Sequence, residues 1–385
     1  MAALLEGFDT QSMGVAAPKL VPEFALSATQ ASFIFSATTV GLFIGAAVGG
    51  RTADRLGRKR TLTLSMLLFG LCSLLTSLSV GPKTLFIARL LTGLGLGGAM
   101  PNFNALASEA AHSSRRLRSV TVVMAGMPFG GLLAGLIALG EGLGWSWRVI
   151  FYVGGVAPVV LAALMWRFLP ESREFTGRVD LADGPGARQP LEAVTSVLFG
   201  SRQALTTLEL WGGFFFTQLV LLLMLNWLPS LFVGLGFSRA QASLASMCFN
   251  FSGACGSILL GQLHAGVRRR LWVILTYTGM AVALIAVPSA GRSFPLAALA
   301  IGCAGVFIIG AQLILFALAP LYYAAAVRGT GVGAAVAIGR LGSVVGPLYA
   351  GALLASGGGS STVLLGIVPF VAIGGASALA LTAHH

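Results

Sequence analysis

The sequence predicts an all-α polytopic membrane protein with twelve transmembrane helices in two halves of six. Composition is the first observation: 56% of the 385 residues are hydrophobic and only 9% are charged, whereas an ordinary soluble domain has about 25% charged residues. Apolar runs are the second, because stretches of about 20 apolar residues, the length that spans a bilayer, occur twelve times. A polar stretch near the middle is the third, and it divides the runs into two sets of six.

The first predicted span differs from the others in length. The spans are, in order, 1–18, 30–50, 61–80, 84–108, 119–140, 148–169, 206–233, 240–263, 271–290, 295–323, 331–355 and 361–382. Met1 opens directly into an apolar run, so we expect helix 1 to be truncated, without its first part. No basic segment precedes the run and no cleavage-like site follows it, which argues against a signal peptide.

Residues 170–205 form a predicted cytoplasmic linker between an N-terminal half, 1–169, and a C-terminal half, 206–385. The segment combines acidic residues with Pro and Gly, the composition of a connecting segment. The two halves also resemble each other, because a shift of 212 positions aligns residues 98–130 with 310–342 at nine identical positions. An internal duplication of six helices explains the match, and parallel repeats of this kind are a transporter architecture.

The distribution of Lys and Arg predicts the orientation of the helices. The connections after the second, fourth, sixth, eighth and tenth spans hold 17 basic residues, and the opposite set holds five. Basic loops stay in the cytoplasm, so we expect a multi-pass protein of a bacterial cytoplasmic membrane with both termini inside. This bias also explains the net charge of +12, so the expected surroundings are a lipid bilayer, with no nucleic-acid partner. We expect the chain to function as a monomer.

The sequence indicates no cofactor, no metal site and no enzymatic centre. The four cysteines all lie inside apolar runs, and none belongs to a C-x-x-C or Cys/His cluster of the kind that binds metals. The spans contain no His pair, no H-E-x-x-H string and no Ser/His/Asp arrangement. A membrane-embedded enzyme is therefore not expected.

The sharpest motif lies between the second and third spans, at residues 50–60. Its pattern, G-x-x-x-D-R-x-G-R-K-R, places one carboxylate among five cations in what we expect to be a compact turn. A carboxylate there can pair with arginines or cap a neighbouring helix, so we interpret the motif as a gate latch; the alternative is a plain topogenic loop. The equivalent segment of the second half, 261–270, lacks the acid. The expected gate residues are Gly50, Asp54, Arg55, Gly57, Arg58 and Arg328.

Two glycine-rich strings point to close helix packing. One follows Arg89 in the fourth span and contains Gly93, Gly95, Gly97 and Gly98; the other occupies residues 126–131 in the fifth span. Glycines let membrane helices approach each other closely. Such packing also suits helices that rock during transport, and both interpretations can hold; we interpret residues 126–131 as structural.

Charged residues inside the spans are candidates for function, because charge is costly in a bilayer and usually faces a cavity. Asp9 lies nine residues before Pro18, and Arg340 lies twelve residues after Arg328. A rise of about 1.5 Å per residue puts both near the middle of a ~30 Å core. Asp9 either carries a proton or forms a structural ion pair. Arg340 either holds an anion or pairs with a helical carbonyl.

The strings together resemble the major facilitator superfamily, whose cytoplasmic signature is similar to residues 50–60. Narrower strings resemble the aromatic acid:proton symporters, and among them the 3-(3-hydroxyphenyl)propionate transporters, over almost the whole chain. These strings are residues 7–9 with 14–18, 102–109, 169–172, 226–229 and 328–340. The departures are the curtailed first span and the missing acid in the second half.

The resemblance implies proton-coupled import of a small aromatic carboxylate, similar to 3-hydroxyphenylpropionate, by alternating access. The alternatives are a drug:proton antiporter and a transporter of sugars or other organic anions on the same scaffold. The candidates for proton coupling are Asp9 and Glu109. The candidates for substrate binding are Arg340, Arg89, Asn102, Asn226, Trp227 and Gln312. An aromatic residue such as Trp227 is also consistent with ordinary packing.

Overall fold

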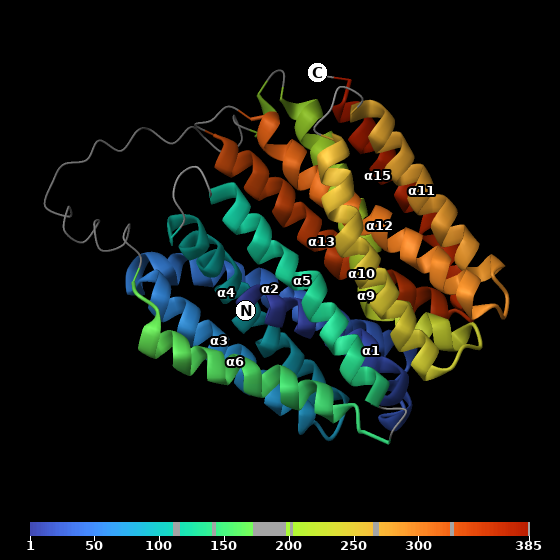
Figure 1. Ribbon diagram of the computed structural model, residues 1–385, viewed down its shortest axis with the longest axis horizontal. Helices are drawn as coiled ribbons and strands as arrows, with labels where there is room; N and C mark the ends of the chain where they lie inside the picture. Colours follow the sequence, from blue (N-terminus) through green and yellow to red (C-terminus); the bar gives the residue numbers. More distant parts are fainter. Residues whose placement is uncertain are drawn as a thin grey trace, which may run out of the picture. The chain divides into compact units, whose positions relative to one another are not determined.

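The computed structural model of the chain is helical throughout its secondary structure in the residues it describes (Figure 1). These are residues 1–110, 116–140, 144–171, 198–200, 203–264, 269–323 and 327–383. The chain divides into two compact units, Met1–Ala187 and Arg188–His385. Most of the predicted linker at 170–205 lies outside the described residues.

Helices account for every predicted span. The N-terminal unit contains α1 (Ala2–Glu23), α2 (Ala28–Leu56), α3 (Arg58–Ser77), α4 (Pro82–Ala110), α5 (Arg116–Leu139) and α6 (Arg148–Phe168). The C-terminal unit contains α9 (Ala204–Gly234), α10 (Arg239–His264), α11 (Arg269–Ser289), α12 (Phe294–Leu318), the 3-10 turn η3 (Ala319–Leu321), α13 (Arg328–Ala355), α14 (Ser360–Gly366) and α15 (Val368–Leu381). Within the described residues, nine helical stretches are long and apolar enough to cross a membrane. The predicted fold class, an all-α membrane protein with twelve helices, is confirmed.

The first helix is longer than the sequence analysis expected. It continues through Pro18 and ends at Glu23, a length of 22 residues, or about 33 Å at the α-helical rise. A proline removes the hydrogen bond to the residue four positions earlier and crowds that carbonyl group, which can bend a helix without ending it, and Leu20 beyond it is fully buried. Ending this span at Pro18 was therefore wrong.

The tenth and twelfth spans are interrupted near their ends. The predicted span 361–382 is divided at Ile367 into α14 and α15. Pro369 occupies the first turn of α15, where its missing N–H is not needed. The tenth span ends as an α-helix at Leu318 and continues as the 3-10 turn η3, which also has a proline in its first positions.

Glycines at equivalent positions of the two units make the closest helix contacts. In the N-terminal unit, a Cβ on Gly93 of α4 would collide with the backbone of α2, and a Cβ on Gly130 of α5 would collide with the backbone of α1. In the C-terminal unit, Gly305 of α12 meets α10 and Gly342 of α13 meets α9 in the same way. Each pair is 212 positions apart, which is the shift of the internal repeat. The structural interpretation of the glycine-rich strings is confirmed.

Candidate functional site

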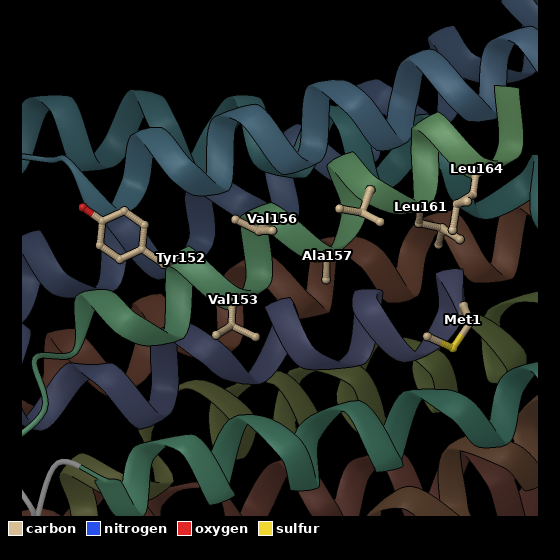
Figure 2. A pocket seen from close by; sticks show the side chains of 8 residues that line it. Met1, Tyr152, Val153, Val156, Ala157, Leu161 and Leu164 are labelled. Atoms are coloured by element: carbon tan, nitrogen blue, oxygen red, sulfur yellow. The ribbon is translucent and has the colours of Figure 1, made fainter. Parts of the chain in front are cut away.

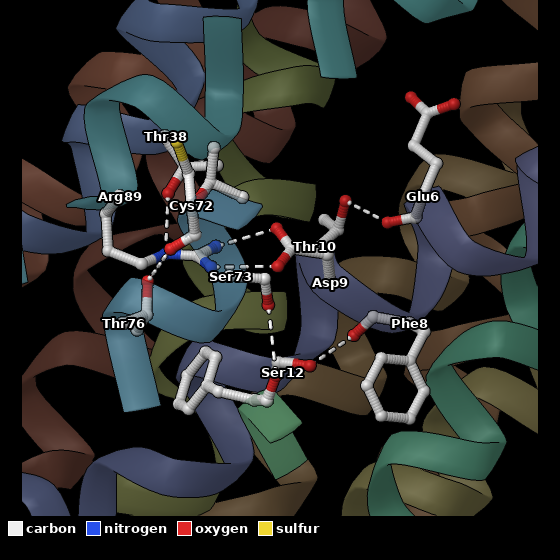
Figure 3. A network of polar contacts seen from close by, with 12 residues as sticks. Glu6, Phe8, Asp9, Thr10, Ser12, Thr38, Cys72, Ser73, Thr76 and Arg89 are labelled. Atoms are coloured by element: carbon white, nitrogen blue, oxygen red, sulfur yellow. Dashed lines mark hydrogen bonds and ion pairs between the residues drawn. The ribbon is translucent and has the colours of Figure 1, made fainter. Parts of the chain in front are cut away.

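A buried ion pair joins α1 to α4 in the N-terminal unit (Figure 3). The Nη1 and Nη2 atoms of Arg89 donate to Oδ1 and Oδ2 of Asp9, each over 2.8 Å. Both side chains are 1% exposed. Two parallel charge-assisted hydrogen bonds of this kind are the strongest geometry available to a guanidinium and a carboxylate.

Neighbouring helices complete the surroundings of Arg89. Its Nε atom donates to Oγ1 of Thr38 on α2 over 3.1 Å, and its guanidinium carbon lies 5.5 Å from the centre of the Phe151 ring on α6. The nearby hydroxyls of Ser12 and Thr76 donate to carbonyls of their own helices. Among the described residues, Arg89 alone supplies hydrogen bonds to the Asp9 carboxylate.

The pairing of Asp9 goes beyond the sequence analysis. Counting residues put Asp9 and Arg340 at similar depths in the membrane without naming a partner, and in the structure both oxygens of Asp9 accept from Arg89. Depth along a helix follows from counting residues, whereas the direction in which a side chain points depends on how the helices are rotated and packed. Of the two interpretations given to Asp9, the ion pair is present; whether Asp9 also carries a proton stays a prediction.

A second acid of α1 is also buried. Glu6 is 2% exposed, and its carboxylate points away from the Asp9–Arg89 pair (Figure 3). The sequence analysis did not include it among the candidates for proton coupling. The i, i+3 spacing of Glu6 and Asp9 was the signal that two acids share one stretch of this helix.

Three of the predicted substrate residues use their donors within the protein. The amide of Asn102 donates to the carbonyl of Gly98, and that of Asn226 to the carbonyl of Leu222, each over 2.8 Å within its own helix. The indole N–H of Trp227 donates to the carbonyl of Pro347 over 3.1 Å and so ties α9 to α13. Roles for these residues in binding substrate stay predictions.

The remaining two candidates lie in the C-terminal unit. Gln312 of α12 is 7% exposed, and neither of its amide atoms has a hydrogen-bond partner among the described residues. Arg340 of α13 is half-buried and follows Gly339, which packs against α9.

The gate motif is more helical than expected. Helix α2 continues to Leu56, α3 begins at Arg58, and Gly57, with φ of 94°, is the one residue between them. The expected compact turn was therefore wrong, since residues 50–56 continue the helix. Arg55 is exposed and Arg58 is half-buried, while Gly50 has open space around it. The side chains of Asp54, Glu109 and Arg328 lie outside the described part of the chain, and the gate itself stays a prediction.

Glu171 occupies the capping position at which the sequence analysis considered Asp54. Its Oε1 atom accepts a hydrogen bond of 2.9 Å from the backbone N–H of Lys59 in the first turn of α3. The same carboxylate fills the space that a Cβ on Gly57 would need. A carboxylate is favourable at a helix N-terminus, where backbone N–H groups are unsatisfied. The string at 169–172 was the signal that could have identified this residue.

An apolar groove runs along α6 (Figure 2). Its lining is apolar, unlike the polar surroundings of the Asp9–Arg89 pair. It is lined by Met1, Tyr152, Val153, Val156, Ala157, Val160, Leu161 and Leu164. Tyr152 contributes the single polar side-chain group of this lining. None of the side chains that line the groove carries a charge.

Two helical units related by an internal repeat, with helices long enough to span a bilayer and an ion pair buried inside one unit, define a polytopic membrane transporter. Solved structures agree with this fold. A bacterial homologue of the human lysosomal transporter Spinster matches with a TM-score of 0.79 at 17% identity, covering 100% of this chain and 95% of the other. A D-xylose–proton symporter matches with a TM-score of 0.78 at 19% identity, covering 99% and 94%.

The chain belongs to the Major Facilitator Superfamily, whose sequence profile matches residues 1–347. Three similar relatives are named as transporters of aromatic acids. The 3-(3-hydroxy-phenyl)propionate transporter of Escherichia coli (strain K12) is 42% identical over 385 residues, covering 100% of this chain and 93% of the relative. The gallate transporter of Pseudomonas putida is 32% identical, covering 100% and 90%. The 4-hydroxybenzoate transporter of Acinetobacter baylyi is 31% identical, covering 100% and 90%.

Proposed function

We propose that this transporter imports a small aromatic carboxylate, similar to 3-(3-hydroxyphenyl)propionate, together with protons. Relatives that cover the whole chain carry the names of aromatic acid transporters. The observation that carries the proposal is the buried Asp9–Arg89 pair, because it brings together an acid that can hold a proton and a cation that can hold a carboxylate.

Proton coupling is assigned to the N-terminal unit. The sequence contains no Asp or Glu after Glu209, so a side-chain carboxyl group that takes up a proton must be Glu209 or precede it. Asp9 and Glu6 are both buried within α1, and Glu109 on α4 is a further candidate. Among the described acids, Asp9 is the one that bonds directly to Arg89, so it loses its cationic partner whenever Arg89 engages another anion.

The ion pair suggests how proton and substrate are linked. In the unprotonated state, Arg89 is held by both oxygens of Asp9. Protonation removes the charge of Asp9 and weakens these bonds, so a substrate carboxylate can compete for Arg89. Each ligand then favours binding of the other, as thermodynamic linkage requires. Arg340, half-buried on α13, is the cation assigned to the carboxylate in the C-terminal unit.

The same pair weighs against the alternative substrates. Export of a cationic drug favours an acid that has no cationic partner, whereas Asp9 is fully engaged by Arg89. A neutral sugar gives a buried arginine no charge to bind. An anionic substrate is the class that uses both members of the pair.

The proposed setting is the cytoplasmic membrane of a bacterium, with both termini inside and the monomer as the working unit. The basic connections support this orientation. Single cysteines placed at Lys59 and Arg202 should react with impermeant reagents only from the cytoplasmic side. Labelling of both from outside would reverse the proposed orientation.

Transport by the purified protein in liposomes tests the function. We expect 3-(3-hydroxyphenyl)propionate to accumulate above equilibrium when the lumen is alkaline. Asp9→Asn mimics the protonated acid, so it should retain exchange of substrate and lose accumulation driven by the pH gradient. Glu23→Gln is the matched control, because Glu23 is an acid of the same helix with 40% exposure, and it should accumulate substrate normally.

Each outcome has a defined meaning. Wild-type liposomes that take up no aromatic carboxylate would overturn the proposed function. Normal accumulation by Asp9→Asn would move proton coupling to Glu6 or Glu109.

A further inference from the structure

Two buried amide side chains in the C-terminal unit lack hydrogen-bond partners. Gln218 on α9 and Gln312 on α12 are each 7% exposed. Among the described residues, no group bonds to Oε1 of Gln218 or to either amide atom of Gln312. An unsatisfied buried polar group costs about 1–3 kcal/mol, so two of them in one unit call for an explanation.

Contacts between rings place the two amides at the same level. Phe214 near the start of α9 meets Phe316 near the end of α12, with ring centres 5.2 Å apart. At the other end, Phe237 just after α9 meets Phe294 at the start of α12, with centres 5.9 Å apart. The two helices are therefore antiparallel.

Each glutamine lies about one helical turn from the phenylalanine of its own helix in the first ring pair. Gln218 lies four residues after Phe214, and Gln312 lies four residues before Phe316. Because the helices are antiparallel, both steps lead in the same direction, by about 6 Å along the axis. Side chains four residues apart also share a helix face. The two amides therefore lie at the same level along α9 and α12, one turn away from the Phe214–Phe316 pair.

Helix α13 joins this cluster at Gly339. A Cβ on Gly339 would lie 3.3 Å from Cγ of Gln218 and 3.4 Å from Cβ of Phe214. Aromatic and amide groups of α9 thus lie against α13 within a single unit. The next residue of α13 is Arg340, a candidate ligand of the substrate carboxylate.

The unsatisfied atoms indicate which group of a ligand the amides would bind. Two carbonyl oxygens need a hydrogen donor, and the Nε2 group of Gln312 needs an acceptor. A carboxylate accepts hydrogen bonds but donates none, whereas a hydroxyl does both. A hydroxyl group on the substrate can donate to one of the two carbonyl oxygens and accept from the Nε2 group of Gln312, whereas a carboxylate can only accept.

We infer that Gln218 and Gln312 form a subsite for the ring hydroxyl of the substrate, with Phe316, which packs against the fully buried Phe214, as its aromatic contact. Phe316 keeps 40% exposure, which leaves part of its ring for contact with the substrate ring. The inference rests on the proposed function and narrows it to hydroxylated aromatic acids. Two of the relatives, with hydroxyphenyl and hydroxybenzoate in their names, transport acids of this class.

The test compares two substrates that differ by one hydroxyl. In liposomes containing the full chain, uptake of labelled 3-(3-hydroxyphenyl)propionate is competed with either the same unlabelled acid or 3-phenylpropionate. We expect the hydroxylated acid to compete at least about 10-fold better in the wild type, because losing the hydroxyl leaves the amides unsatisfied. Gln312→Met and Gln218→Met should each weaken the hydroxylated acid about 10-fold and change 3-phenylpropionate less than about 3-fold.

Asn250→Leu is the matched control, because Asn250 is a buried amide of the same unit whose Nδ2 donates to the carbonyl of Ser246 over 2.9 Å. It should leave the ratio between the two acids unchanged.

Equal competition by both acids in the wild type would overturn the inference while leaving aromatic acid transport intact. An unchanged ratio in both glutamine variants would also overturn it. If the wild type transports neither acid, the proposed function fails and the subsite fails with it. Should one variant not fold, the wild-type ratio and the other variant decide.

Discussion

The interiors of the two units differ in how their polar groups are paired and charged. The N-terminal unit buries a complete ion pair, in which Asp9 and Arg89 satisfy each other at 1% exposure. The C-terminal unit buries the neutral amides Gln218 and Gln312, in which Oε1 of Gln218 and both amide atoms of Gln312 have no hydrogen-bond partner among the described residues. Gln11 on α1 is a buried amide of the same kind, so the sharpest contrast is one of charge.

This contrast suggests a division of labour. A charge cannot remain buried alone, so it must be paired inside the protein, and the pair can then be opened by a proton. A neutral amide can remain without a partner at a smaller free-energy cost, so it can stay unpaired until a ligand binds. The N-terminal unit is therefore suited to coupling and the C-terminal unit to recognition.

The largest effect is expected from breaking the ion pair. Arg89→Ala leaves the Asp9 carboxylate buried without its cation, which destabilises a protein by about 3–5 kcal/mol. The double variant Asp9→Asn with Arg89→Ala should recover part of this loss, because no charge remains. Thermal unfolding of the purified protein in detergent measures both. Equal destabilisation of the single and double variants would show that the charge of Asp9 is not the cause.

A smaller effect, shared by both units, is expected from their repeated glycine contacts. Gly93→Ala and Gly305→Ala each insert a Cβ against a backbone carbonyl, of Thr38 and Phe249 respectively. Overpacking of this kind costs about 1–3 kcal/mol. Gly50→Ala is the control, because a Cβ there meets nothing within 4 Å, and it should unfold at the wild-type temperature or slightly above. If only one of the two contact glycines is sensitive, the packing of the two units is less alike than the repeat indicates.

A third prediction concerns the cap of α3. Glu171→Ala removes the acceptor of the Lys59 N–H, and loss of a helix cap costs about 0.5–2 kcal/mol. Glu171→Gln keeps an acceptor and should retain more stability than Glu171→Ala. Hydrogen exchange of the amides at 58–61 provides the local measurement. Unchanged exchange in Glu171→Ala would contradict the capping role.

The smallest effect is expected at the exposed ion pair of α1. Arg148 donates to Glu23 over 2.6 Å, but the two side chains are 31% and 40% exposed. Exposed pairs contribute about 0–1 kcal/mol, so Arg148→Ala should lower the unfolding temperature only slightly, and added salt should reduce the difference. A loss of stability as large as that in Arg89→Ala would show that burial does not determine how much each of the two ion pairs of α1 contributes.

The sequence by itself determined the membrane class, the twelve spans and the repeat of 212 positions. Span length, apolar composition and glycine spacing are local properties, and a bilayer-spanning helix satisfies its backbone within itself. The candidates Asp9, Arg89 and Gln312 could also be identified from the sequence, since polar residues are conspicuous in apolar runs.

Tertiary structure alone decided which of these groups meet. That Asp9 pairs with Arg89, that Glu171 caps α3, and that Phe214 of α9 meets Phe316 of α12 all depend on the rotation and neighbours of each helix. A count of residues gives the depth of a side chain in a helix. Its direction follows from the packing of ridges and glycines against other helices, which is a property of the assembled unit.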